Sequence, residues 1–206
     1  MCRYSGSKPA PRCEMPKSKD DFSSALEGLV RLYLMNQKGF EQAFLGLKSN
    51  IDLVCGRSNE HHRPGEKYTK HPHQSRLTSD AIESIARSLA GIESMQFDDF
   101  EQLINYVRTP VIPYFKLTNS YDFAFRYGLN HGIVPRRYVY IHAGALSGAM
   151  HLRQLGYISF DPAVCKIAHS QFPPVLRRLP AFHLENFLCV MKKHLAGLPI
   201  AGSTNK

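Results

Sequence analysis

Residues 112–155 constrain the fold most, because they read as two helices joined by a short, basic, proline-containing connector. The first helix is predicted over 119–131, where Thr118 can cap the first turn and glycines and a proline end the last. The second, over 143–155, alternates small and larger apolar residues, which is typical of a helix packed closely against a neighbour. Between them, residues 138–141 have β-branched and aromatic content, but this segment is too short to form a sheet alone and is predicted to be an extended connector.

Apolar residues at helical spacing predict further helices, and no internal repeat is visible. The predicted fold class is therefore all-α, a mostly helical single domain with at most a very short extended segment. The first two of these helices, separated by Gly39, are expected to form a helical hairpin. The additional predicted helices cover 20–34, 40–47, 80–91, 97–107 and 181–195.

The expected organisation is one domain over 20–196 with a flexible tail at each end. The basic tail 1–19 is rich in Pro, Ser, Lys and Gly, and the tail 197–206 is small and polar. Within the domain, residues 56–76 contain almost no apolar side chain, and are predicted to form a long, exposed, histidine-rich loop.

The composition excludes several classes of protein. The five cysteines form no CxxC pair and no even framework, so zinc-ribbon, thioredoxin-like and disulfide scaffolds lose support, and reduced thiols in a cytoplasmic protein are expected. The sequence contains no run of eighteen apolar residues, and no apolar run follows the basic N-terminus, so neither a membrane span nor export is expected. No motif in the chain implies a cofactor.

Basic residues are unevenly distributed along the chain. Residues 1–107 contain 14 basic and 14 acidic residues, whereas residues 108–206 contain 12 basic and 3 acidic residues, so the whole excess of +9 is C-terminal. Because Lys and Arg gain affinity for phosphates by releasing condensed counterions, this distribution favours a nucleic-acid partner, with DNA expected first. A basic surface without a partner is the alternative interpretation.

Two short motifs resemble the helix-hairpin-helix DNA glycosylases, over about residues 112–156. Ile112-Pro113-Tyr114-Phe115-Lys116-Leu117-Thr118 stands where that family has an Ile-Pro-Gly-hydrophobic-Gly hairpin, and Val139-Tyr140-Ile141-His142 resembles its Val-Asp-Thr-His segment. The resemblance implies a helix-hairpin-helix unit whose backbone amides bind DNA phosphate. It also implies a Lys that attacks or assists at the sugar and a catalytic Asp.

The chain departs from that family at the positions that carry its chemistry. Tyr114 and Lys116 replace both hairpin glycines, Thr118 stands near the position of the family's Lys, and Tyr140 replaces its Asp. Lys116 is misplaced by two residues, and a phenol cannot stabilise a developing cation as a carboxylate does. The resemblance therefore implies the fold and DNA binding without the glycosylase reaction, and no catalytic residue is assigned.

Side chains are expected to contact phosphates in place of the missing glycines, because an Arg fork matches phosphate geometry. Arg126 also lies near the predicted unit, but Asp122 precedes it by four residues, so an ordinary ion pair is the favoured interpretation. The predicted nucleic-acid-binding residues are Lys116, Thr118, Arg136, Arg137 and Arg153.

Two other residues are candidates for a functional role. Tyr140 occupies the position of the family's Asp, and His142 interrupts an apolar run, where it is either a general base or a buried histidine bonded to a backbone carbonyl.

The remaining alternatives belong to different functional classes. His61, His62, His71 and His73 lie within thirteen residues and are candidate metal ligands for a metal-assisted hydrolase. No carboxylate or thiolate stands at a ligand spacing, so a solvated loop is favoured. A protein-interaction module is the other alternative, in which the acidic stretch 77–107 and the basic 108–195 serve a partner protein or a second copy.

Overall fold

The computed structural model describes residues 19–37, 39–110, 112–113 and 115–198. The predicted N-terminal tail lies outside the described residues apart from Lys19, and the predicted C-terminal tail does so from residue 199 onward. Tyr114, one of the two residues that replace a hairpin glycine, also lies outside them.

The predicted all-α class is confirmed. The described residues form α-helices joined by short 3-10 helices, with one two-stranded sheet. In chain order the elements are α1 (Lys19–Gln37), η1 (Phe40–Phe44), α2 (Asn50–Cys55), η2 (Pro72–Gln74), α3 (Ser79–Ser88), η3 (Ala90–Ser94), α4 (Phe100–Arg108), α5 (Leu117–His131), β1 (Tyr138–Tyr140), α6 (Ala143–Gln154), β2 (Lys166–Ala168), η4 (His169–Gln171), η5 (Leu176–Arg178), α7 (Ala181–Val190) and α8 (Lys192–Ala196).

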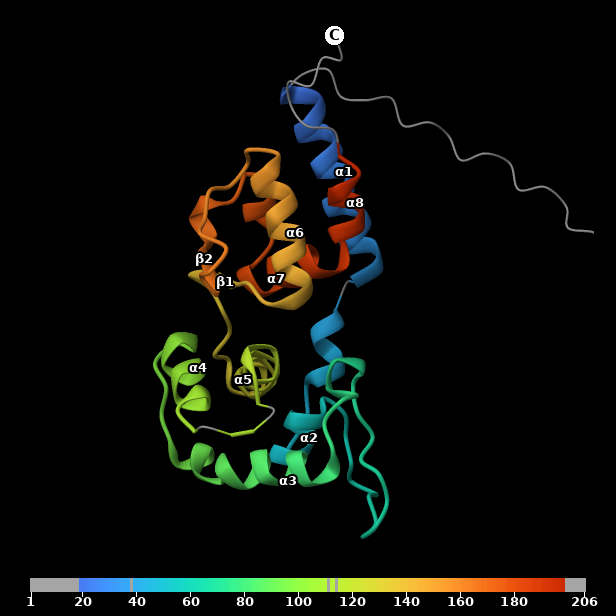
Figure 1. The fold of residues 1–206 in the computed structure, drawn as a ribbon, viewed down its shortest axis with the longest axis vertical. Helices are drawn as coiled ribbons and strands as arrows, with labels where there is room; N and C mark the ends of the chain where they lie inside the picture. Colours follow the sequence, from blue (N-terminus) through green and yellow to red (C-terminus); the bar gives the residue numbers. More distant parts are fainter. Residues whose placement is uncertain (1–18, 38, 111, 114, 199–206) are drawn as a thin grey trace, which may run out of the picture.

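These elements form two lobes, one above the other in Figure 1. The sheet lobe (residues 19–37 and 138–198) contains α1, α6, α7, α8 and both strands around one apolar core. The helical lobe (residues 39–137) contains η1 to α5 around a second core. The predicted domain 20–196 thus holds two cores, and the helical lobe is inserted between α1 and the rest of the sheet lobe.

Strand β1 lies at the junction of the two lobes. It pairs antiparallel with β2, with Val139 opposite Ile167, so the prediction of an unpaired connector over 138–141 is wrong. Its partner strand is only three residues long and carries no alternating pattern that would reveal it. Because side chains alternate along a strand, Val139 joins the core of the sheet lobe and Tyr140 joins the core of the helical lobe.

The predicted N-terminal hairpin is also wrong. Gly39 adopts a left-handed conformation with φ 72°, after which Phe40–Phe44 form a short 3-10 helix rather than a second α-helix. Helix α1 packs on α7 of the sheet lobe, whereas η1 packs on α5 of the helical lobe. The two segments therefore belong to different lobes.

Several helix ends also differ from the prediction. The segment 181–195 is broken at Met191 into α7 and α8, and 80–91 ends as the separate 3-10 helix η3. Helix α2 was not predicted, although Ser49 and Asp52 form a capping box at its start.

Helices α6 and α7 pack closely, as the small residues of 143–155 predicted. A Cβ atom at Gly148 would lie 2.2 Å from the carbonyl oxygen of Leu188 on α7. Glycine is therefore required where these two backbones meet.

Candidate functional site

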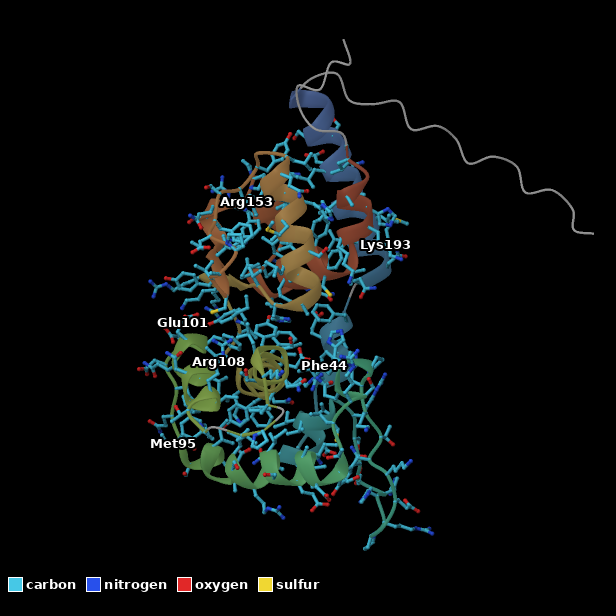
Figure 2. The ribbon with its side chains drawn as sticks, viewed as in Figure 1. Phe44, Met95, Glu101, Arg108, Arg153 and Lys193 are labelled. Carbon is cyan, nitrogen blue, oxygen red and sulfur yellow. The ribbon has the colours of Figure 1, made fainter. Side chains whose placement is uncertain are left out.

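The two lobes together line a cavity of about 400 Å3, termed here the interlobe cleft. Phe40, Phe44, Tyr121 and Phe125 give it an aromatic surface, and Figure 2 shows Phe44 at the level of the boundary between the lobes. Its other polar residues come from the helical lobe and from α1 and α7 of the sheet lobe. They are Gln37, Arg57, His71, His73, Asp122, Arg126, Glu185 and Asn186.

Arg126 lies beneath the cleft and is almost completely buried. Its Nη1 donates hydrogen bonds to the carbonyl oxygens of Leu53 and Val54 at 2.9 and 3.3 Å. Its Nη2 donates to Gln74 Oε1 at 2.8 Å and lies 3.7 Å from Asp122 Oδ2. The favoured prediction of an Arg126–Asp122 ion pair is confirmed, and this guanidinium is not available to a phosphate.

Gln74 connects this pair, and it comes from the loop that was predicted to be exposed. Its Nε2 donates to Asp122 Oδ2 at 2.7 Å, while its side chain is fully buried. The loop folds back on itself because His71 N–H donates to the Cys55 carbonyl at 2.8 Å. The prediction of an exposed loop is therefore wrong near the end of 56–76, where the buried side chain of Gln74 forms hydrogen bonds with a buried ion pair rather than with solvent.

Gly56 allows the guanidinium of Arg126 to approach the end of α2. It adopts φ 65°, and a Cβ atom there would lie 2.5 Å from Cζ of Arg126. Any larger residue would therefore displace the buried charge.

Asp122 remains ionised in this environment. Burial would raise its pKa, but the interaction with His73, whose Nδ1 lies 3.4 Å from Oδ2, and the charge of Arg126 together lower the pKa to about 2. The buried carboxylate is stable here because Gln74 and His73 form hydrogen bonds to it and Arg126 carries positive charge.

The acid stability of the protein should depend on Asp122. Since folding lowers its pKa from 3.8 to about 2, its ionisation stabilises the native state above pH 4 and is lost as the pH falls toward 2. In urea unfolding at both pH values, Asp122→Asn should reduce the unfolding free energy relative to wild type, by about 2 kcal/mol more at pH 4 than at pH 2. An equal reduction at both values would show that Asp122 is not ionised as described.

A second buried pair joins α7 to the start of α6. His142 Nε2 lies 3.4 Å from Glu185 Oε1, and the two side chains are only 6% and 12% exposed. Burial lowers the pKa of His142 to about 4, while burial and the charge of Asp122 raise the pKa of Glu185 well above its usual value. His142 was predicted either as a base or as a histidine bonded to a carbonyl, yet its Nε2 has no hydrogen-bond partner among the described residues.

Two cations are associated with the cleft, one from each lobe. Arg57 of the helical lobe is exposed and lines the cleft. Lys192 of the sheet lobe is not among the lining residues, but its positive charge opposes the protonation of His73, which lines the cleft. Among the described residues neither cation forms an ion pair within 4.0 Å, so both remain available to an anion. We call Arg57 and Lys192 the cleft rim.

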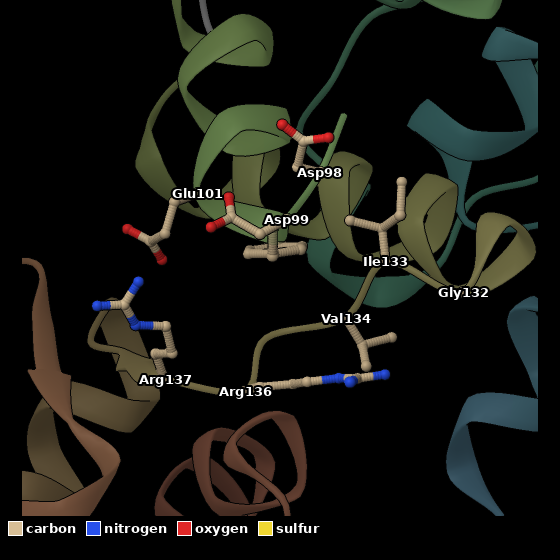
Figure 3. A pocket seen from close by; sticks show the side chains of 9 residues that line it. Asp98, Asp99, Glu101, Gly132, Ile133, Val134, Arg136 and Arg137 are labelled. Carbon is tan, nitrogen blue, oxygen red and sulfur yellow. The ribbon is translucent and has the colours of Figure 1, made fainter. Parts of the chain in front are cut away.

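The predicted nucleic-acid-binding residues do not line this cleft. Arg136 and Arg137 lie in a separate cavity of about 280 Å3 that also contains Asp98, Asp99 and Glu101. Figure 3 shows the Arg137 side chain directed toward Glu101. The three carboxylates that line this cavity oppose the approach of a phosphate to it.

The other three predicted residues are dispersed. Lys116 is the exposed N-cap residue of α5, and Thr118 lies in its first turn. Arg153 lies on α6 with its guanidinium over the ring of Phe160, away from the lobe boundary in Figure 2.

Tyr140 is part of the core of the helical lobe. Its side chain is buried, and its hydroxyl donates to Glu101 Oε1. Lys166 also binds Glu101, so a residue of the acidic stretch 77–107 contacts the basic half within the same molecule. Part of the two surfaces expected for a partner protein is therefore used inside the chain.

The loop histidines that are candidate metal ligands divide between two environments. His62 stacks on Tyr68, whereas the rings of His71 and His73 meet 4.8 Å apart beside the cleft. In the described part of the chain, no group of three or more His, Cys, Asp or Glu side chains is placed to hold a metal ion.

Sequence reasoning missed Glu185, Gln74 and the cleft rim. One signal was available, since residues 108–206 contain only three acidic residues, and two of these, Asp122 and Glu185, line the cleft. A rare carboxylate on an otherwise apolar helix face indicates a special environment.

Comparisons of the chain with protein-family models, with curated proteins and with solved structures gave no match. No described helix combines the length and the apolar character that crossing a membrane requires.

Proposed function

We propose that the protein binds nucleic acid at the interlobe cleft, with DNA as the first candidate, and that it has no glycosylase activity. In this proposal Arg57 and Lys192 bind phosphates on either side of the cleft, and an unpaired base enters between its aromatic side chains. The observation that carries the proposal is a cavity lined by four aromatic side chains and the unpaired Arg57, with a second unpaired cation, Lys192, acting on His73 of the same cavity. Proteins that bind single strands combine stacking surfaces with a positively charged groove in this way.

The charge of the chain supports this proposal. The C-terminal half carries the whole net positive charge of the chain. Arg126 is a third cation beside the two of the cleft rim, whereas Asp122 is the one carboxyl group of the cleft with a lowered pKa. The potential near the cleft therefore favours a polyanion.

The resemblance to helix-hairpin-helix DNA glycosylases agrees with DNA binding but not with their chemistry. Helices α4 and α5 flank residues 112–116, in the order that the resemblance implies. The footprint proposed here is nevertheless the cleft rather than residues 112–137, because Arg136 and Arg137 share their cavity with three carboxylates. Tyr140 stands in place of the family's Asp, and its hydroxyl is bound to Glu101, which supports a protein that binds without excising bases.

Anisotropy titration of labelled single-stranded and duplex DNA, at about 50 and about 200 mM salt, tests the proposal. Wild type should bind single strands, and its affinity should fall steeply with salt. Each neutralised phosphate contributes about −0.7 to the slope of log affinity against log salt concentration. The double variant Arg57→Ala/Lys192→Ala should bind more weakly and reduce that slope by about 1.4, since it removes two phosphate contacts.

Arg136→Ala/Arg137→Ala is the matched control, because it removes the same number of charges from a cavity that contains acidic residues. It should retain the slope of the wild type. Absence of binding at the lower salt, or equal losses in both double variants, would contradict the proposal.

A further inference from the structure

Glu185 places a largely buried carboxyl group in the wall of the interlobe cleft. It projects from α7, whose other buried residues are apolar, and its side chain is 12% exposed. Among the described residues it makes no hydrogen bond, and His142 Nε2 lies 3.4 Å from its Oε1. That nitrogen is buried and also lacks a hydrogen bond.

Such an arrangement is unfavourable for the free protein. A buried donor or acceptor without a partner destabilises the free protein, so a ligand that supplies a partner binds more tightly. Backbone strain is found at the same place, because Ala143, next to His142, is the one non-glycine residue with positive φ in the described part of the chain. Strained residues of this kind cluster at ligand sites.

The chemistry of the pair defines the ligand it can take. Burial and the nearby charge of Asp122 both raise the pKa of Glu185, which favours the neutral form of its carboxyl group. A neutral carboxyl offers one donor and one acceptor side by side. The hydrogen-bonding edge of a nucleobase offers the complementary pair, and its flat faces suit the rings of Tyr121 and Phe125 that line the same cleft.

We infer that Glu185 forms a bidentate hydrogen-bonded pair with the edge of an unpaired base held in the interlobe cleft, with His142 as a positioning residue behind it. This inference rests on the proposed nucleic-acid binding and names the group that recognises the base. It separates two roles, since the cleft rim holds the backbone and Glu185 holds the base.

The test compares two single-stranded oligonucleotides of equal length, one with bases and one built entirely of abasic residues. Binding of each to wild type, Glu185→Ala and Glu185→Gln is measured by anisotropy at low salt. Glu185→Ala should weaken binding of the base-containing strand about tenfold, as expected for two lost hydrogen bonds, and leave the abasic strand unchanged. Glu185→Gln should stay within about twofold of wild type, because an amide also presents one donor and one acceptor.

Glu60→Ala, which removes an exposed loop carboxyl outside the cleft, is the control and should bind both strands as wild type does. Glu185→Leu supplies a second apolar variant if Glu185→Ala fails to fold, and the same tenfold loss is expected of it. An unchanged affinity in the apolar variants, or an equal loss for both strands, would overturn the role of Glu185 while leaving the proposed function standing. Failure of wild type to bind either strand would instead remove the proposed function itself.

Discussion

Arg126→Ala is expected to lower the free energy of unfolding by about 3–5 kcal/mol, the loss typical of breaking a buried ion pair from one side. The substitution leaves the carbonyl groups of Leu53 and Val54 and the Gln74 amide without a donor. It also leaves the buried carboxylate of Asp122 without its strongest positive neighbour. Urea unfolding at neutral pH, followed by circular dichroism, measures the loss.

The matched control is Arg87→Ala, which removes the same side chain from an exposed i,i+4 pair with Glu83. It should change stability by less than about 0.5 kcal/mol. Arg126→Lys should fall between the two, since an ammonium keeps the charge but cannot reproduce the fork of hydrogen bonds. Equal losses for Arg126→Ala and Arg87→Ala would show that the buried network contributes nothing.

Gly148→Ala is expected to destabilise the sheet lobe by about 3 kcal/mol, at the upper end for an overpacked core. The added methyl group would lie 2.2 Å from the Leu188 carbonyl oxygen and within 3.0 Å of its Cα, so backbone rather than a flexible side chain must move. Helices α6 and α7 would have to separate along the most extensively packed helix pair of the lobe. Thermal and urea unfolding both report the change.

Gly28→Ala is the control for the same substitution in an open helical environment. A Cβ atom at Gly28 would meet nothing within 4 Å, so the higher helix propensity of alanine should raise stability by up to about 1 kcal/mol. If Gly148→Ala were also neutral or stabilising, the close contact between α6 and α7 would be wrong.

Local patterns in the sequence predicted the helices well and the lobes poorly. Helix α5 lies within two residues of its predicted start and α6 within one of its predicted end, because capping residues, glycines and apolar spacing act over a few residues. The pairing of β1 with β2 depends on residues 28 positions apart, since Val139 faces Ile167. Three-residue strands carry too little pattern to reveal such a partner.

The site was less predictable because its members come together only in the folded chain. Arg126 and Asp122 are four residues apart on one helix, and that pair was predicted from spacing alone. Gln74 and Glu185 reach the same region from a polar loop and from a distant helix, where nothing local marks them. Arg136 and Arg137, predicted from positive charge alone, lie in a different cavity with three carboxylates, because charge in the sequence does not specify which acidic neighbours surround it.

The insertion of the helical lobe into the sheet lobe has a consequence for synthesis on the ribosome. Tyr33 of α1 is bonded to His183 of α7, 150 residues later, and both lie beside the core that Leu184 and Phe187 complete. At the usual rate of translation this separation corresponds to roughly 10–30 seconds. During that interval the apolar face of α1 lacks the helices that cover it, because α7 is synthesised after the whole helical lobe.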